Sequence, residues 1–220
     1  MFSGCTSLTK APKLPATTLT DWCYLSMFED CSSLIEAPEL LGTTLAIYCY
    51  QEMFKGCVAL KQAPELPATT LTDWCYQAMF KGCTSLTQAP NLPATSLAIQ
   101  CYNNMFSSCT SLTKAPKLPA KVLSIGCYNS MFSGCVSLHQ APELIATTLT
   151  NGCYYSMFTG CSRLNDITML ATDITATNSL TNWVDGVSST GTFKKAKETT
   201  SLPQGSSGIP KGWTVKNYGE

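Results

Sequence analysis

Apolar residues recur along most of this chain with a period of 26 residues. In the segment 23–31 they stand at offsets 0, 1, 4, 5 and 8, as Cys23, Tyr24, Met27, Phe28 and Cys31. These offsets trace one face of a two-turn helix. Asp21 lies just before the segment, as Asp73 and Asn151 do in later units, and such residues cap helix starts. Glycines at positions 56, 82, 134 and 160 fit the helix end. The pattern therefore predicts a short helix in each unit.

The other half of each unit carries prolines and predicts an extended segment. Pro12 and Pro15 exclude a helix from the segment 8–15, and prolines recur at matching positions in later units. Because proline donates no hydrogen bond to a ladder, we expect strands of only three or four residues, stacked in parallel about 4.8 Å apart. A fixed period of this length is typical of solenoids, whose units hide their apolar faces by stacking. The sequence thus predicts an α/β fold, a right-handed solenoid of about seven leucine-rich coils with short parallel strands and short helices.

The repeats divide the chain into two parts. Residues 1–176 form the predicted solenoid, and its first unit is incomplete, because the opening residues match the end of the internal units. We therefore expect any targeting segment to lie upstream, and an uncovered first coil would favour end-to-end self-association. Near residue 177 the period ends, and residues 177–220 are predicted to be a small β-rich C-terminal cap with strands at 191–195 and 212–216.

Charge and hydropathy argue against two classes of partner. The formal net charge is zero, only 13% of the residues are charged, and no run of Lys or Arg occurs. This composition argues against a nucleic-acid groove and against an anionic membrane surface. No apolar stretch approaches the roughly 20 residues that span a bilayer, so no membrane insertion is expected in these residues.

The chain contains 13 cysteines, which in a small secreted protein would indicate disulfides. Here the number is odd, and each Cys keeps a fixed phase beside Leu, Met and Phe. This placement favours two stacked columns of reduced, buried thiols, with disulfides as the alternative. Metal ligation is not expected, because no Cys-x-x-Cys occurs and His139 is the only histidine. No cofactor is predicted.

The sequence also argues against an enzyme. His139 occupies a variable position whose counterparts include Thr113 and Asn165, so we interpret it as a surface substitution. Asp and Glu are thinly spread, and no phosphate loop, calcium loop or nucleophile elbow occurs. General-base and nucleophilic chemistry lack their usual groups, and no catalytic residue is predicted.

The repeated phrase Leu-x-x-Ala-Pro-x-Leu-Pro, followed by Cys-Tyr-x-x-Met-Phe-x-Gly-Cys-x-Ser-Leu, covers about residues 1–176. It resembles the leucine-rich repeats of BspA-like bacterial surface antigens. The unit here is longer than the usual unit of that family, and Ala-Pro-x-Leu replaces Ile-x-Ile. The resemblance implies a curved leucine-rich repeat solenoid on a bacterial cell surface that acts in adhesion or binds host matrix proteins.

Two rows of variable positions are candidate binding sites, because equivalent positions of stacked units form lines on the surface. The first row is polar and lies on the strand side: Lys13, Glu39, Glu65, Asn91, Lys117 and Glu143. Beside it runs a second polar line: Lys10, Glu36, Gln62, Gln88, Lys114 and Gln140. These positions either recognise a protein ligand or form a solvated face whose charges avoid like-charge stacking.

The other candidate row is aromatic and consists of Trp22, Tyr48 and Trp74. Three aromatic rings in consecutive coils either stack sugar rings, anchor a protein partner, or pack on the convex surface over neighbouring leucines. The variable rows favour a non-enzymatic binding module, and the resemblance to BspA-like antigens implies that it lies on a cell surface and binds a protein ligand, such as a host extracellular matrix protein. A carbohydrate-binding module that uses the aromatic row and a purely structural spacer are the alternatives.

Overall fold

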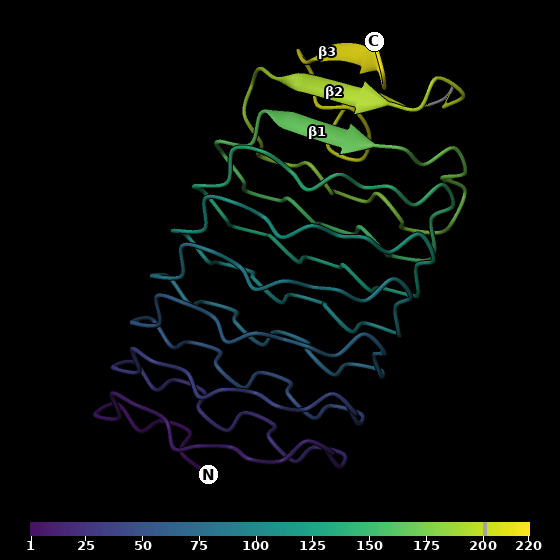
Figure 1. Cartoon of the computed structure of the whole chain (residues 1–220). Coiled ribbons are helices and arrows are strands. Elements are labelled where there is room, and N and C mark those ends of the chain that lie inside the picture. The colour runs from purple at the N-terminus through teal and green to yellow at the C-terminus, as the bar shows by residue number, and fades with distance from the viewer. Residues whose placement is uncertain (200–201) are drawn as a thin grey trace.

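The computed structural model describes residues 1–199 and 202–220 and shows an elongated stack of similar coils, with the two termini at opposite ends (Figure 1). We number the coils in chain order. Coil 1 covers residues 5–30, and each later coil covers the next 26, up to coil 7 at residues 161–186. Each coil has a turn side, residues 20–30 in coil 1 and their equivalents, and a proline side, residues 8–18 in coil 1 and their equivalents.

The predicted helices are absent from the residues that the structure describes, so the α/β fold class with short helices is wrong. The turn side is instead a series of overlapping turns, in which every second N–H donates to the carbonyl three residues before it. Met27 N–H donates to Tyr24 C=O across 3.2 Å, and Cys31 N–H donates to Phe28 C=O across 3.1 Å. Within residues 1–199 and 202–220 no helix is long and apolar enough to cross a membrane.

The remaining N–H groups of the turn side donate to the next coil. Tyr24 N–H bonds Cys49 C=O at 3.0 Å, and Phe28 N–H bonds Met53 C=O at 2.9 Å, in each case 25 residues ahead. A helix would direct these N–H groups along its own axis and leave none for the neighbouring coil. The turns therefore pair each coil with the next while the backbone of the segment stays satisfied.

Residues with positive φ make this ribbon of turns possible. In coil 1 they recur every four residues, at Trp22 (57°), Ser26 (48°) and Asp30 (57°). Glycine takes the third of these positions in most later coils, with φ of 76° at Gly82, and glycine and short polar residues tolerate this conformation. The apolar offsets that predict a helix also repeat every four residues. Over two turns, that spacing cannot be told from the 3.6 residues of a helix.

On the proline side, the predicted strands of three or four residues are also missing from most coils. Adjacent coils meet at single parallel bridges, such as Glu36↔Gln62. The cause is the Ala-Pro pair that follows each of these positions, since proline has no N–H for a ladder. Where Ile167 and Thr168 replace that pair, a strand does form, β1 (Asp166–Met169).

A small parallel sheet stands at the C-terminal end of the stack (Figure 1). β2 (Thr192–Lys195) and β3 (Thr214–Asn217) join β1 in the order β1-β2-β3. Ile167 lies opposite Phe193, and Phe193 lies opposite Val215. β2 and β3 overlap the two strands predicted for the tail. They continue the stack beyond coil 7, at its C-terminal end.

The backbone pairing continues past residue 177, where the sequence period ends. Phe158 N–H donates to Trp183 C=O across 2.8 Å, in the same register as in the earlier coils. The Trp183 side chain is fully buried against the rings of Tyr154 and Phe158. Its indole N–H donates to Gly208 C=O across 2.8 Å. Trp183 therefore covers the end of the aromatic columns and ties them to the tail.

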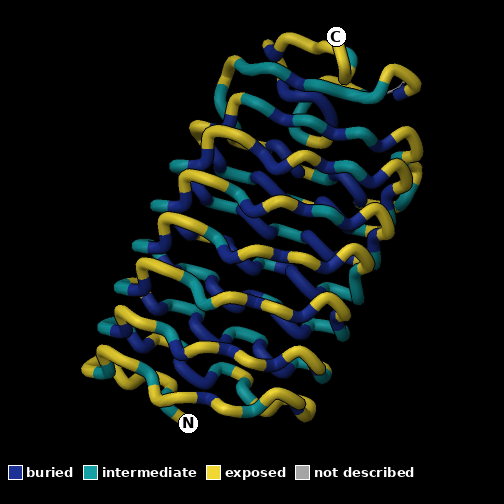
Figure 2. The backbone as a smooth tube through the Cα atoms, in the orientation of Figure 1, coloured by how far each residue is buried: buried dark blue, intermediate teal, exposed yellow. Residues whose placement is uncertain are grey.

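The core is one continuous cluster that runs through the whole stack, and Figure 2 shows its buried segments following one another from coil to coil. The phenyl rings from Phe28 to Phe158 stack with centroids 5.7 Å apart. The tyrosine rings from Tyr24 to Tyr154 stack at 5.7 to 6.1 Å. Stacked aromatic pairs add to the free energy of apolar burial. Most coils thus repeat the buried side chains of their neighbours and differ from them mainly at the surface.

Candidate interaction surface

The cysteines form the two columns that the sequence predicts, and all 13 are free thiols. Eleven are buried, while Cys5 and Cys23 are exposed. Burial raises the pKa of the Cys49 thiol and of the Cys57 thiol to about 12. These thiols therefore stay protonated at neutral pH, and a protonated thiol is neither a nucleophile nor a metal ligand. In the described part of the chain, no group of three or more His, Cys, Asp and Glu side chains could hold a metal ion.

The polar row lies on the surface of the proline side. All six of its members are exposed: Lys13, Glu39, Glu65, Asn91, Lys117 and Glu143. The line beside it is aligned by direct backbone bridges that run from Lys10 to Lys114. Equivalent side chains of successive coils therefore stand beside one another, one coil apart.

The charges of these two lines are mostly unpaired. Lys10 and Glu36 form an ion pair between coils 1 and 2, with 2.9 Å between the Lys10 Nζ and the Glu36 carboxylate oxygen. Both side chains are largely exposed, so this pair contributes at most about 1 kcal/mol. No member of the Lys13 row forms an ion pair within residues 1–199 and 202–220. The side chains of that row are therefore accessible to a partner.

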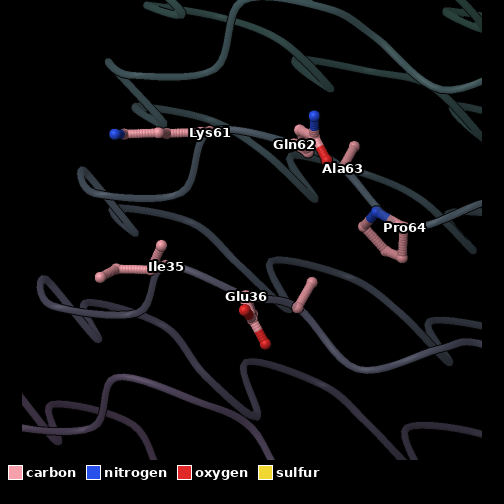
Figure 3. Close-up of a pocket in the computed structure, with 7 residues that line it drawn as sticks. Ile35, Glu36, Lys61, Gln62, Ala63 and Pro64 are labelled. Carbon is pink, nitrogen blue, oxygen red and sulfur yellow. The ribbon is translucent and has the colours of Figure 1, made fainter.

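Shallow grooves separate neighbouring coils on the proline side. Figure 3 shows the groove between coils 2 and 3, which Glu36, Gln62 and Pro64 line, with the side chains of Ile35 and Lys61 pointing to the same side. Similar grooves lie between coils 1 and 2 and between coils 4 and 5. Each groove lies at the Ala-Pro pairs, where the backbone ladder is interrupted, and polar side chains form its rims.

The aromatic row is a continuous stack on the turn side. The ring centroids of Trp22 and Tyr48 lie 6.1 Å apart with an interplanar angle of 12°, and those of Tyr48 and Trp74 lie 4.9 Å apart with an angle of 13°. Trp22 is 57% exposed, whereas Tyr48 and Trp74 are half-buried. Because the rings face one another, the stack presents mainly their edges to solvent. A sugar platform needs exposed ring faces, so this arrangement suits carbohydrate binding poorly.

All three aromatic residues have positive φ, between 55° and 58°. This conformation is unusual for a bulky side chain. Coils 5 and 6 have Gly126 and Gly152 at the same position, and glycine adopts positive φ without steric cost because it has no Cβ. Stacking between the rings offsets part of this conformational strain in coils 1 to 3.

Asp21 and Asp73 do not cap helices. The Asp21 Oδ1 accepts the backbone N–H of Ile47 across 2.9 Å, and the Asp73 Oδ1 accepts that of Ile99 across 2.9 Å. Each carboxylate therefore joins one coil to the next, a role that the sequence of a single unit cannot reveal.

Lys121 belongs to the same surface, although the repeat pattern does not single it out. It is exposed on coil 5, at a position where every other coil from 1 to 6 has threonine. A change of chemical class within an otherwise constant column is the signal that identifies it.

No family model, curated protein or solved structure matches this chain. The assignment of a function therefore depends on the geometry of the surface described above.

Proposed function

We propose that this chain is a non-enzymatic protein-interaction module that acts in adhesion at a bacterial cell surface. Its ligand is a protein, such as a protein of the host extracellular matrix. The binding surface consists of the two polar lines on the proline side and the grooves between coils. One observation carries the proposal: constant core columns support exposed positions that change from coil to coil, as in Lys13, Glu39 and Asn91.

A recognition surface needs exposed side chains of different chemistry on a backbone that holds them in place. Stacked repeats meet this need, because each coil is positioned by its neighbours and presents its variable residues in rows. The grooves add a second feature, since an extended segment of a partner fits a surface whose backbone groups are not fully paired. The exposed edges of the aromatic row give less support to a carbohydrate ligand.

The test is binding of the purified chain to one panel of immobilised matrix proteins and glycans. We expect saturable binding to at least one matrix protein. The double variant Glu39→Gln with Glu65→Gln should lower the affinity for that protein about tenfold, because a few side chains supply most of the binding energy of an interface. Trp22→Ala with Trp74→Ala is the control and should bind almost as the unchanged chain does. Binding to glycans alone, lost in the aromatic variant, would contradict the proposal, and binding to no member of the panel would favour a structural spacer.

A further inference from the structure

The middle third of the chain contains no carboxylate side chain. Asp73 and Glu143 bound a segment, residues 74–142, without a single Asp or Glu. The same segment contains four lysines and no arginine: Lys81, Lys114, Lys117 and Lys121. A chain of zero formal charge therefore carries a local positive field over coils 4 and 5, and such fields attract anionic partners.

Three of these lysines lie on coil 5, next to the groove between coils 4 and 5. Lys114 and Lys117 line that groove, and Gln88 and Asn91 line it from coil 4. All four side chains are exposed. In an extended segment, Lys114 and Lys117 are separated by about 10 Å. The groove thus has amide groups along one rim and two ammonium groups along the other.

The side chains on both rims have no partner within the described part of the chain. Lys114 and Lys117 belong to none of its ion pairs. The groove between coils 1 and 2 has lysines at the same two positions, Lys10 and Lys13, but there carboxylates face them, and Lys10 pairs with Glu36 at 2.9 Å. Of the grooves between coils 1 and 2, coils 2 and 3, and coils 4 and 5, the last combines two lysines with neutral neighbours, and the other two do not.

The residue that follows Lys117 in the polar row is Glu143 on coil 6, and its carboxylate lies near Tyr218. The negative charge of the nearby Glu143 carboxylate raises the pKa of the Tyr218 phenol. Glu143 forms no ion pair with Lys117 in the part of the chain that the structure describes. Lys117 is therefore left without a counter-ion from the coil that follows it.

The backbone of the groove is also sparsely paired. Within residues 1–199 and 202–220, the segments 88–93 and 114–119 meet at one isolated bridge, Gln88↔Lys114, and beyond it Pro90 and Pro116 interrupt the ladder. The Gln88 and Asn91 amides each offer both a donor and an acceptor. Peptide groups of an extended chain match such partners, since they also carry one donor and one acceptor each.

We infer that the groove between coils 4 and 5 binds an extended acidic segment of a partner protein. Carboxylates about three residues apart along that segment contact Lys114 and Lys117, and its peptide groups hydrogen-bond the amides of Gln88 and Asn91. Lys121 extends the positive rim beyond the groove. The observations favour a peptide over a sulfated glycan, because the groove has no arginine, the residue that matches sulfate-like groups with two parallel hydrogen bonds. This inference rests on the proposed function, since it names the chemistry of the protein ligand.

The test uses the full chain and two fluorescent peptides. One has Glu at every third residue, separated by Ala and Pro, and the other has Gln in place of each Glu. A heparin oligosaccharide is the third probe, and binding is measured by fluorescence anisotropy or competition at low salt and at about 0.5 M salt, where charges are strongly screened. The test variant is Lys114→Gln with Lys117→Gln. The matched control is Lys10→Gln with Lys13→Gln, which removes two charges from the same positions of coil 1.

We expect the Glu peptide to bind at least tenfold more tightly than the Gln peptide. The test variant should lose about tenfold in affinity for it, and the control less than twofold, because in coil 1 carboxylates already offset the lysines. High salt should weaken the binding. Equal losses in the two variants, equal affinity for the two peptides, or lysine-dependent binding of heparin without binding of the Glu peptide would overturn the inference.

The matrix-protein panel separates this inference from the proposed function. If Lys114→Gln with Lys117→Gln leaves panel binding intact while Glu39→Gln with Glu65→Gln weakens it, the groove is not the binding site and the proposed function stands. If the Glu peptide binds through the two lysines but no panel protein binds, the groove assignment stands and the matrix ligand is wrong.

Discussion

The thiol of Cys83 donates a hydrogen bond to the backbone carbonyl of Phe54, with 3.1 Å between the sulfur and the oxygen. The same contact, 29 residues back along the chain, recurs at Cys57 with 3.0 Å and at Cys109 with 3.1 Å. The Phe54 carbonyl also accepts the N–H of Cys57 across 3.1 Å. The thiol column therefore links successive coils through side chains, in addition to the backbone ladder.

Cys83→Ala should lower the free energy of unfolding by about 1 to 2 kcal/mol, because it removes this hydrogen bond and leaves a small cavity. Urea unfolding followed by circular dichroism measures the change. Cys5→Ala is the matched control, since Cys5 stands at the same position of the repeat but is exposed, and its effect should stay within about 0.5 kcal/mol. Equal effects at the two positions would show that the buried thiol contact contributes nothing.

The buried thiols should make the protein sensitive to alkaline pH. Burial raises the pKa of Cys49, Cys57 and Cys161 to about 12, whereas thiols of the unfolded chain titrate near about 8.5. Above that pH the unfolded state releases thiol protons that the folded state retains. The contribution of the buried thiols to the free energy of unfolding is therefore complete below about pH 8.5 and falls as the pH rises toward 12. The urea midpoint under reducing conditions should decrease steadily from about pH 8 to pH 10. A constant midpoint over this range would contradict the burial of the thiol columns.

Gly82 tests the turn geometry. Its φ is +76°, and a Cβ placed there would meet no atom nearer than the Gly56 nitrogen at 3.7 Å. Gly82→Ala therefore introduces conformational strain without a clash and should destabilise the fold by about 1 kcal/mol. Gly82→Asn should cost less, because Asn tolerates positive φ. If Gly82→Ala left the free energy of unfolding unchanged, or lowered it less than Gly82→Asn does, the turn side would not have the backbone conformation described above.

Hydrogen exchange should differ between the two sides of one coil. The N–H groups of Ala78 and Phe80 donate to the next coil, across 2.7 and 2.9 Å. Within the described residues, the segment 88–93 joins the neighbouring coils only through isolated bridges at Gln88, to Gln62 and to Lys114. Peptides that cover residues 76–80 should therefore exchange far more slowly than peptides that cover residues 88–93, as measured by mass spectrometry. Equal rates would mean that the proline side is held by contacts that the structure does not contain.

Several features of the fold are predictable from one repeat. The fixed phase of Cys31, Cys57 and their equivalents beside aromatic residues identifies buried thiols. The Ala-Pro pairs correctly predict sparse pairing on their side, and the loss of such a pair at Ile167 coincides with β1. The residues of the polar row are exposed, but the groove between coils 4 and 5 depends on which side chains meet across two coils.

The helix prediction failed at residues 23–31 because a four-residue apolar spacing suits both a helix and a ribbon of turns. In coil 1, Ser26 and Asp30 contained the distinguishing signal, since two poor helix formers stand four residues apart where φ is positive; Glu52 and Ala78, at the Ser26 position of coils 2 and 3, hide it. The same signal appears at Asn178, Asn182 and Gly186, which keep positive φ in the same register after the sequence period has ended.

The sequence by itself determined the repeat length and the set of side chains that each coil buries, because both follow from the period and the pattern of apolar residues. Only the tertiary structure decided where the backbone hydrogen bonds go. The acceptor of Tyr24 N–H is Cys49 C=O, 25 residues ahead, and that acceptor comes within reach only when two coils stack. Local propensity describes one coil, whereas this pairing is a property of two.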